Sequence, residues 1–399
     1  MRVLTVNPGS SSIKLAVVDE GVEVDALVVD TASADRARGP LTEMVRRWQP
    51  IDAVGVRFVH GGEVAEAALL DEVEVLRLKA LVSLAPLHQP LSLAMAGLAA
   101  ELVPGRVFAC FDTAFHAGLP EPAARYALPR RWVREHRLRR YGFHGLSCAH
   151  ALRRTAELLD ADPGELQMVC CHIGAGVSAT AIRNGRSVDT SMGFTPLEGA
   201  VMATRSGSVD PGLLLYLLRT DVTDVAGLDD ALDNSSGLAG MTGTSGDIRE
   251  VMVVRAGGDA EAALAIEVYL HRLRREIAAV ASSLDRLDAV VFTGGVAEHQ
   301  PALIAELADG LSLFGVEVDA GRLADPGDRI VSPDGAPVRV AVVTAREDLE
   351  IARQISLAVT SEGPHEAVTN DRSAAAPAAH SVKADRVGKA GLRCEHATS

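Results

Sequence analysis

The chain has 399 residues, more than the ~100–200 residues of a usual single domain, so its length predicts two domains. Its 53 Asp and Glu outnumber its 39 Lys and Arg, and the net charge of -14 argues against nonspecific binding to nucleic acid or to an anionic membrane. The five cysteines show no CxxC spacing, and no apolar run reaches the ~18 residues of a membrane helix. We therefore expect free thiols, no membrane-spanning segment and a cytoplasmic location.

The first motif is a polar turn, NPGSSSIK at residues 7–14, between apolar runs at residues 3–6 and 13–18. This pattern predicts a strand, a tight turn and a second strand, with Gly9 allowing the backbone to turn. Ser10, Ser12 and Lys14 surround the turn with hydrogen-bond donors that suit a phosphate group. Taken alone, such a turn is more often an ordinary hairpin.

Two later strands are expected to deliver charged groups to a site. The β-branched run at residues 52–59 carries Arg57, and the apolar run at residues 106–111 ends on Asp112. Open α/β sheets place their sites at the carboxyl ends of parallel strands, so we expect both side chains there. A surface arginine and a capping aspartate are the alternatives.

Glycines flank His144 in the motif YGFHG at residues 141–145, which permits a close approach by a ligand. Ser147 is predicted to cap the amino terminus of a helix that runs to residue 159. His88 lies in a predicted loop at residues 85–90, and we expect it to be a loop residue.

The opening pattern recurs from residue 167. An apolar run at residues 168–172 precedes a turn at residues 174–178, and residues 179–182 form another apolar run. This likeness to residues 3–18 predicts an internal duplication, in which each copy opens its own domain. The two turns would then face phosphate groups across a shared cleft.

The second half contains two long irregular segments. Residues 189–211 carry Pro196 and Arg205, and residues 234–249 end on Asp247 and Arg249. Long irregular segments in a compact domain are usually functional or disordered, and the first is too apolar for disorder.

The rest of the chain predicts regular elements and a tail. Apolar residues at helical spacing indicate a core helix over residues 260–284, and the strand at residues 288–292 leads to Gly295, where a nucleotide can lie against backbone. A last strand at residues 339–343 precedes Glu347 and a helix to about residue 359. Residues 361–399 lack aromatic residues and are expected to form a disordered tail.

Together these motifs resemble the acetate kinase family, within the sugar kinase, heat-shock chaperone and actin superfamily. NPGSSSIK, VRFVHGG, APLH, FDTAFH, YGFHG, DTSMGFTPLEG, TRSG and VFTGG occur in that family's order. The resemblance implies an α/β fold built from two ribonuclease-H-like, actin-like ATPase domains with a cleft between them. It implies an N-terminal domain at residues 1–147, completed by the helix at about 349–359, and a nucleotide-binding domain at residues 148–348.

The resemblance also implies the reaction and a role for each matching residue. The reaction is reversible transfer of a phosphoryl group from ATP to acetate, with Mg²⁺ or, as an alternative, Mn²⁺. The catalytic residues would be Arg57, Asp112, His144 and Arg205, and the metal side would contain Asn7 and Glu347. Arg57 and a small apolar pocket of Val59, Leu87, Phe143 and Pro196 would hold acetate. ATP would lie against Ser10, Ser12, Lys14, His172, Gly174, Gly176, Asp247, Ile248, Arg249, Gly295, Val296 and His299.

Several positions depart from the family's pattern. Ala175 stands where the family usually has Asn, which removes an amide donor expected near the ATP phosphates. The other departures are Val56 for His, Gln89 for Asn, Ser208 for Asp, Arg346 for Asn, and Ala297 and His299 in the usual GIGEN. Because the groups expected at the chemistry all match, we expect these changes to affect nucleotide affinity more than the reaction.

Three other functions remain open. Propionate or another short-chain carboxylate is an alternative substrate, because a pocket of this kind discriminates one methylene by only ~1–3 kcal/mol. A nucleotide-binding regulatory protein without turnover is a second alternative, and a sugar kinase using Asp112 as base is a third. The family is usually dimeric, so we also expect a homodimer.

Overall fold

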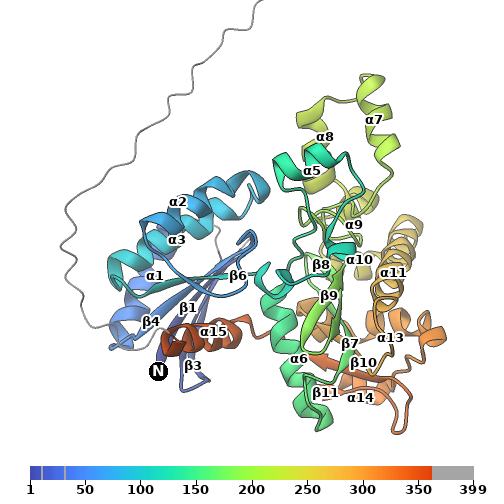
Figure 1. Cartoon of the computed structure of the whole chain (residues 1–399). Coiled ribbons are helices and arrows are strands. Elements are labelled where there is room, and N and C mark those ends of the chain that lie inside the picture. Colours follow the sequence, from blue (N-terminus) through green and yellow to red (C-terminus); the bar gives the residue numbers. More distant parts are fainter. Residues whose placement is uncertain (10–11, 31–32, 362–399) are drawn as a thin grey trace, which may run out of the picture. The chain divides into compact units, whose positions relative to one another are not determined.

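The computed structural model describes residues 1–9, 12–30 and 33–361, and its strands form two six-stranded sheets (Figure 1). The predicted tail beyond Ser361 and the predicted phosphate-side residue Ser10 lie outside the described residues. In that described part of the chain, no helix is both long enough and apolar enough to cross a membrane.

The first sheet has the strand order β3-β2-β1-β4-β6-β5. Its strands are β1 (Arg2–Pro8), β2 (Ile13–Asp19), β3 (Val22–Val29), β4 (Ala53–Phe58), β5 (Ala68–Leu69) and β6 (Val107–Phe111). The central strands β1, β4 and β6 run parallel, whereas β2, β3 and β5 pair antiparallel. The central strands are covered on both faces, which explains why the sequence reads as nearly continuous apolar runs there.

The second sheet has the order β11-β12-β10-β7-β8-β9. Its strands are β7 (Gln167–Ile173), β8 (Val177–Arg183), β9 (Arg186–Thr190), β10 (Ala289–Thr293), β11 (Arg329–Ile330) and β12 (Arg339–Val343). The parallel strands are again the central ones, β7, β10 and β12.

The two sheets repeat one topology, which confirms the predicted duplication. Each begins with an antiparallel three-strand meander, continues through two parallel strands and ends with a two-residue antiparallel edge strand. Even an irregularity recurs, because the register shifts at Val17/Val18 in the first meander and at Ala181/Ile182 in the second. The turn after β1 and the turn after β7 therefore occupy equivalent places in the two sheets.

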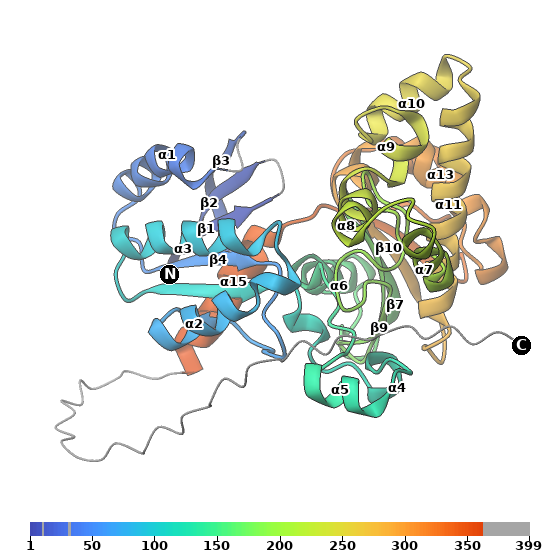
Figure 2. The ribbon, with the colours of Figure 1, turned by 90° about the horizontal axis from the view of Figure 1, so that it is seen from above.

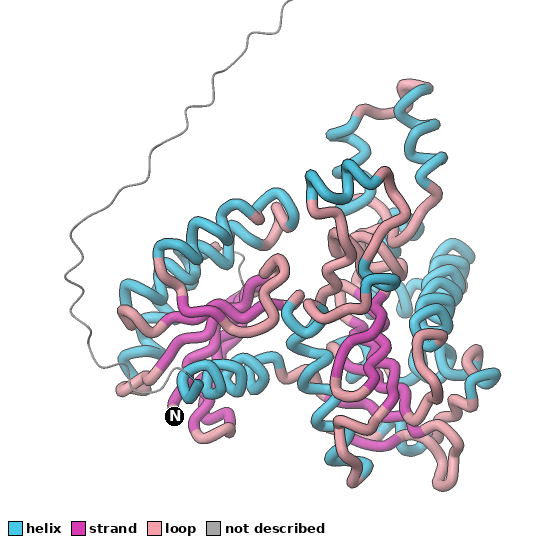
Figure 3. The backbone as a smooth tube through the Cα atoms, viewed as in Figure 1, coloured by secondary structure: helices cyan, strands magenta, loops and turns pink. Residues whose placement is uncertain are grey.

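Helices cover the faces of both sheets (Figures 1 and 3). Those that precede the second sheet are α1 (Ala34–Arg47), α2 (Glu72–Ala80), α3 (Gln89–Leu102), α4 (Glu121–Ala124), α5 (Arg130–His136) and α6 (Gly145–Leu159). Those between β9 and β10 are α7 (Pro211–Arg219), α8 (Val225–Asn234), α9 (Gly237–Thr242), α10 (Ile248–Ala256) and α11 (Ala260–Ala281). The last are α12 (Gly295–His299), α13 (Pro301–Asp309), α14 (Ala320–Ala324) and α15 (Glu347–Ser361).

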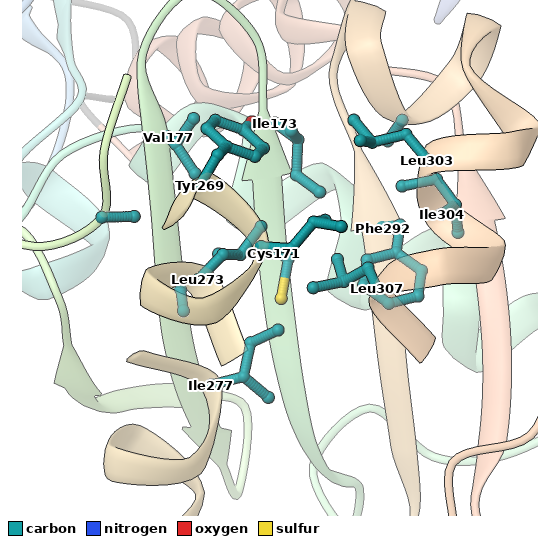
Figure 4. Close-up of a cluster of buried hydrophobic side chains, with 14 of the residues drawn as sticks. Cys171, Ile173, Val177, Tyr269, Leu273, Ile277, Phe292, Leu303, Ile304 and Leu307 are labelled. Atoms are coloured by element: carbon teal, nitrogen blue, oxygen red, sulfur yellow. The ribbon is translucent and has the colours of Figure 1, made fainter. Parts of the chain in front are cut away.

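Alternate residues of each central strand face different helices. In the first sheet, Leu4 and Val6 share a core with α1 and α3, whereas Val3 packs with Ile351 and Ile355 of α15 on the opposite face (Figure 2). In the second sheet, β7 and β10 pack against α11 and α13 on one face, where Tyr269 and Phe292 lie (Figure 4), and against α6 on the other.

A buried ion pair joins α6 to α15. The Glu350 carboxylate is fully buried and accepts hydrogen bonds from Arg153 of α6 and from Arg353 and Gln354 of its own helix. Because α6 follows His144 directly and α15 starts at Glu347, this pair connects the helices behind two predicted site residues.

Two predicted helix ends are wrong, and residues 234–249, which were expected to be irregular, contain helix α9. Helix α6 starts at Gly145, so Ser147 lies inside the helix and is not its cap; its hydroxyl bonds His172 instead. Helix α11 ends at Ala281, and Leu284 packs against the core from beyond the helix.

Candidate active site

A cavity of about 800 Å³ gathers most of the predicted site residues. The predicted residues along its wall are Asn7, Ser12, Lys14, Arg57, Val59, Asp112, Phe143, His144, His172, Gly174, Gly176, Pro196, Arg205, Arg249, Gly295 and Glu347. A neighbouring cavity of about 290 Å³ is lined by Asp247, Ile248, Val296 and His299, and it shares Gly174, Arg249 and Gly295 with the larger one. Leu87 is 56% exposed and lines neither cavity.

Arg57 and Asp112 form a two-point ion pair in the larger cavity. Arg57 lies near the end of β4 and Asp112 directly follows the neighbouring parallel strand β6. Arg57 donates from Nε to Asp112 Oδ1 at 2.9 Å, from Nη2 to Oδ2 at 2.6 Å, and from Nη1 to Asn7 Oδ1 at 2.9 Å. The guanidinium plane is thus fixed by groups at the ends of β1 and β6, the two strands on either side of β4.

Burial and the neighbouring charges together set the charge state of this pair. It would lower the pKa of Arg57, but the nearby Asp112 and Glu347 carboxylates raise it above its usual value. Burial raises the pKa of Asp112 to about 6, against the opposing effect of Arg57. The carboxyl group is therefore mostly ionised at pH 7 and takes up a proton in mildly acidic solution.

Glu347 adds a second carboxylate to the same group. Its Oε2 accepts a hydrogen bond from Asn7 Nδ2 at 2.6 Å and lies 3.5 Å from Arg57 Nη1. Burial opposes its ionisation, yet Arg57, His172 and Asn7 lower the pKa of Glu347, so it stays charged at neutral pH.

His144 is held by an unusual backbone. It has φ 58°, in the left-handed region, immediately before α6. The next residue must be glycine, because a Cβ on Gly145 would lie 2.3 Å from the carbonyl oxygen of Asp112. Gly145 also donates its N–H to that carbonyl at 2.8 Å, which ties His144 to the ion pair. This explains the glycine after the histidine in YGFHG.

The His144 ring is oriented from both sides. Its Nδ1 shares a hydrogen bond with Ser178 Oγ at 3.0 Å, and the ring stacks on His172 with centroids 4.1 Å apart. His172 is in turn bonded through Nδ1 to Ser147 Oγ at 2.9 Å. Burial, His172 and the site arginines lower the pKa of His144 well below its ordinary value, so the ring is neutral at pH 7.

Of the two arginines in the predicted catalytic set, Arg205 has the weaker counter-charge. Its Nη1 donates to the Pro196 carbonyl at 3.2 Å, and its Nε lies 3.8 Å from the Asp233 carboxylate. Burial lowers the pKa of Arg205, although Asp233 partly opposes this. A buried cation with one distant counter-charge is well prepared to accept an anion.

The second turn brings these groups together at one point. A Cβ placed on Gly176 would lie 3.2 Å from His144 Nε2 and 3.6 Å from Arg205 Nη1, so the turn backbone, the histidine and the arginine meet there. Gly294 has φ 91° and packs against the backbone of Ile173 at the end of β7. This contact holds the Gly294–Gly295 pair next to the turn that follows β7.

Sequence reasoning missed several residues of this site. Ser147 and Ser178 orient the two histidines, Asp233 approaches Arg205, and His88 lines the larger cavity although it was expected to be an ordinary loop residue. The duplicated turn could have pointed to Ser178, which is the last residue of the predicted turn. Nothing in the sequence pattern near Asp233 indicates its partner.

The family model described as the acetokinase family matches residues 39–353. An acetate kinase from a Synechococcus species is 41% identical over 396 residues, covering 88% of this chain and 98% of that protein. The acetate kinase of Streptomyces coelicolor is 40% identical, covering 91% of this chain and 98% of the relative.

Solved structures give the same result. The crystal structure of Porphyromonas gingivalis acetate kinase is 31% identical and superposes with a TM-score of 0.81, covering 90% of this chain and 99% of that chain. A propionate kinase from Francisella tularensis is 30% identical with a TM-score of 0.81, covering 88% of this chain and 98% of the other. The two-domain α/β fold is therefore the one found in these kinases, and the chain belongs to the acetokinase family.

Proposed function

We propose that this protein is an acetate kinase, which transfers the γ-phosphoryl group of ATP reversibly to the acetate carboxylate. The observation that carries the proposal is the meeting of the Gly176 turn, His144 and Arg205 at one point of the larger cavity. Phosphoryl transfer needs positioning and charge stabilisation, and this point offers backbone, a neutral donor and a guanidinium together. The curated relatives named acetate kinase support the same reaction.

In this mechanism the acetate carboxylate is already the nucleophile, so no general base is needed. One carboxylate oxygen forms a bond to the γ-phosphorus while the bond from that phosphorus to the bridging oxygen breaks, and the electron pair stays on ADP. Arg57, fixed by Asp112, would hold the acetate carboxylate. Arg205 would spread its charge over the transferring oxygens.

His144 would donate a hydrogen bond to the same oxygens. Its ring is neutral, so with Ser178 Oγ donating to Nδ1 the proton sits on Nε2, the atom closest to the Gly176 turn. Val59, Phe143 and Pro196 line the cavity near Arg57 and would receive the acetate methyl group. Leu87 would have to move to complete that pocket, because its side chain is exposed.

Mg²⁺ fits the donor set as an ion that arrives with ATP. The part of the chain that the structure describes has no group of three or more His, Cys, Asp or Glu that could cage a metal by itself. Glu347 and Asn7 offer one carboxylate and one amide oxygen at the cavity wall, and Mg²⁺ typically uses one or two such ligands together with phosphates and water. The bound ion would neutralise phosphate charge during transfer.

The nucleoside would occupy the smaller cavity. Ile248 and Val296 give its wall an apolar part, while Asp247 and His299 supply polar groups. The larger and smaller cavities meet at Gly174 and Gly295, so a nucleotide in one would extend its phosphates into the other. We likewise propose that residues 148–348 carry the nucleotide and that residues 1–147, completed by about residues 349–359 of α15, form the other domain.

A hydroxylamine-trapping assay tests the proposed reaction directly. Purified protein is incubated with ATP, Mg²⁺ and acetate, propionate or butyrate, and hydroxylamine traps any acyl phosphate. Acetate is expected to give the highest kcat/KM. A higher value for propionate would assign the protein to the propionate kinases, whereas ATP-dependent thermal stabilisation without any hydroxamate would favour the regulatory alternative.

We further propose a homodimer in a reducing cytoplasm. Helix α7 exposes Leu213, Leu215 and Tyr216 and has no buried residue, which leaves an apolar surface suited to a second subunit. Cys110, Cys148, Cys170 and Cys171 are buried free thiols, in keeping with a reducing compartment. Sedimentation of wild type and of Leu215→Glu tests the assembly, and a wild-type monomer would exclude it.

A further inference from the structure

The loop at residues 191–199 belongs to no helix or strand, yet it reaches the reacting groups. Pro196 lines the larger cavity, and its carbonyl oxygen accepts a hydrogen bond from Arg205 Nη1 at 3.2 Å. The position of this loop therefore sets both one wall of the cavity and one hydrogen bond of a catalytic arginine.

Glu198 anchors the loop to the segment before α6. Tyr126 Oη donates to Glu198 Oε2 at 2.5 Å, and Arg140 Nη2 donates to Oε1 at 2.7 Å. The two donors are neighbours, because Arg140 donates its N–H to the Ala124 carbonyl and its guanidinium carbon lies 5.6 Å from the Tyr126 ring centroid. One carboxylate thus accepts from two side chains that already pack together.

The same two side chains also hold the loop backbone. Phe194 donates its N–H to Tyr126 Oη at 2.9 Å, and Arg140 Nη1 donates to the Ser191 carbonyl at 3.0 Å. The fit is tight, since a Cβ on Gly193 would lie 1.7 Å from Glu198 Oε2 and 2.2 Å from Tyr126 Oη. The loop is therefore held at both ends and at its middle.

The charges favour this arrangement. Burial and the Glu198 carboxylate raise the pKa of Tyr126, so its hydroxyl keeps its proton and donates. Burial would lower the pKa of Arg140, but Glu198 raises it above its usual value. The side chains of Arg140 and Glu198 are only 17% and 35% exposed, so water competes weakly for their bond.

We propose that Tyr126, Arg140 and Glu198 are positioning residues for the acceptor side of the reaction. They touch no reacting atom, but they fix Pro196 and, through its carbonyl, the guanidinium of Arg205. The inference rests on the proposed function, since it assigns the loop to the acetate side of that site. None of the three lines the smaller cavity, and the loop that they hold contributes no residue to it, so we expect a larger effect on acetate than on ATP.

The test uses Tyr126→Phe, which removes the hydroxyl and keeps the ring, and Glu198→Gln, which keeps the size and removes the charge. Glu43→Gln is the matched control for the second change, because Glu43 of α1 is exposed and pairs with the exposed Arg46 of the same helix. We expect kcat/KM for acetate to fall roughly 10- to 100-fold in the first two variants, as for a small misplacement of reacting groups. KM for ATP should stay within about twofold, since uniform binding of the nucleotide is unchanged.

A merely structural role would lower the melting temperature without lowering kcat/KM for acetate, and that result would overturn the inference. Equal changes in the KM values of ATP and acetate would also overturn it. Glu198→Gln decides the matter if Tyr126→Phe fails to fold. Folded wild-type protein that makes no acyl phosphate would instead overturn the proposed function, and this inference with it.

Discussion

Removal of either site arginine should abolish activity, but only the removal of Arg57 should strongly destabilise the fold. Arg57→Ala and Arg205→Ala are both expected to abolish most phosphoryl transfer, because each removes a guanidinium from the transferring group or its acceptor. Arginines of this kind contribute about 10³- to 10⁵-fold to kcat in phosphoryl transfer. Their effects on folding should differ sharply, since their partners differ.

Arg57 neutralises a carboxylate that has almost no access to water. Asp112 is 1% exposed and receives two hydrogen bonds from Arg57. Its removal would leave Asp112 buried near Glu347 with no cation, and breaking a buried pair in this way costs about 3–5 kcal/mol. Arg57→Ala should therefore lower the free energy of unfolding by that amount at pH 8, where Asp112 is ionised in the native protein.

Removal of Arg205 should leave no buried charge without a close partner, because Asp233 is partly exposed and 3.8 Å away. The change loses one hydrogen bond to the Pro196 carbonyl, worth about 1 kcal/mol, and a contact with Asp233 at 3.8 Å. Against this loss, the variant no longer buries a guanidinium whose pKa is lowered by burial. We expect the free energy of unfolding to change by less than about 1 kcal/mol.

The assay is urea denaturation at pH 8, followed by fluorescence and circular dichroism, combined with the hydroxamate assay. Arg38→Ala is the control, because its pair with Glu101 is exposed and should contribute little. Equal destabilisation by Arg57→Ala and Arg205→Ala would refute the reasoning. So would an Arg205→Ala variant that retains wild-type kcat.

Three further predictions concern pH, nucleotide and metal. Because the folded-state pKa of Asp112 is raised to about 6, kcat/KM for acetate should fall as pH drops below that value. Asp112→Asn should remove this fall at acidic pH. A fall that persists in Asp112→Asn would assign the titration to the substrates. The sign for stability is opposite, since a raised carboxyl pKa favours the fold most below pH 4 and this contribution disappears as pH rises through 6. Ala175→Asn should lower KM for ATP about 3- to 10-fold by adding one donor to the turn that both cavities share, and a lack of change in KM would show that the amide is not needed. Glu347→Gln should raise the Mg²⁺ concentration for half-maximal activity at least tenfold with little change in KM for acetate, and an unchanged Mg²⁺ requirement would exclude Glu347 from the metal side.

The fold was largely predictable because its signals are local and repeated. Two copies of a strand, turn and strand pattern mark β1 with β2 and β7 with β8, and the sheets repeat even the register shift that follows. The family resemblance is confirmed, and the residues placed at Arg57, Asp112, His144 and Arg205 do line one cavity.

Other parts of the site could not be predicted, because they depend on contacts between distant segments. Ser147 looks like a helix cap in the sequence, but the left-handed His144 starts the helix three residues earlier, and the serine hydroxyl bonds His172 instead. Glu198 meets Tyr126 across 72 residues, and no periodicity or turn chemistry indicates such a pair. Leu87 matches its motif but not its expected place, since a motif fixes residue identity and not side-chain burial.

The Arg153–Glu350 ion pair has a mechanical consequence. Helix α6 follows His144 directly and helix α15 begins at Glu347, so the pair links the helices that carry the proposed phosphoryl-side and metal-side groups. Loss of the Glu350 carboxylate would remove this link, although Glu350 lines neither of the two cavities. The contact therefore couples the placement of His144 to that of Glu347 from outside both cavities.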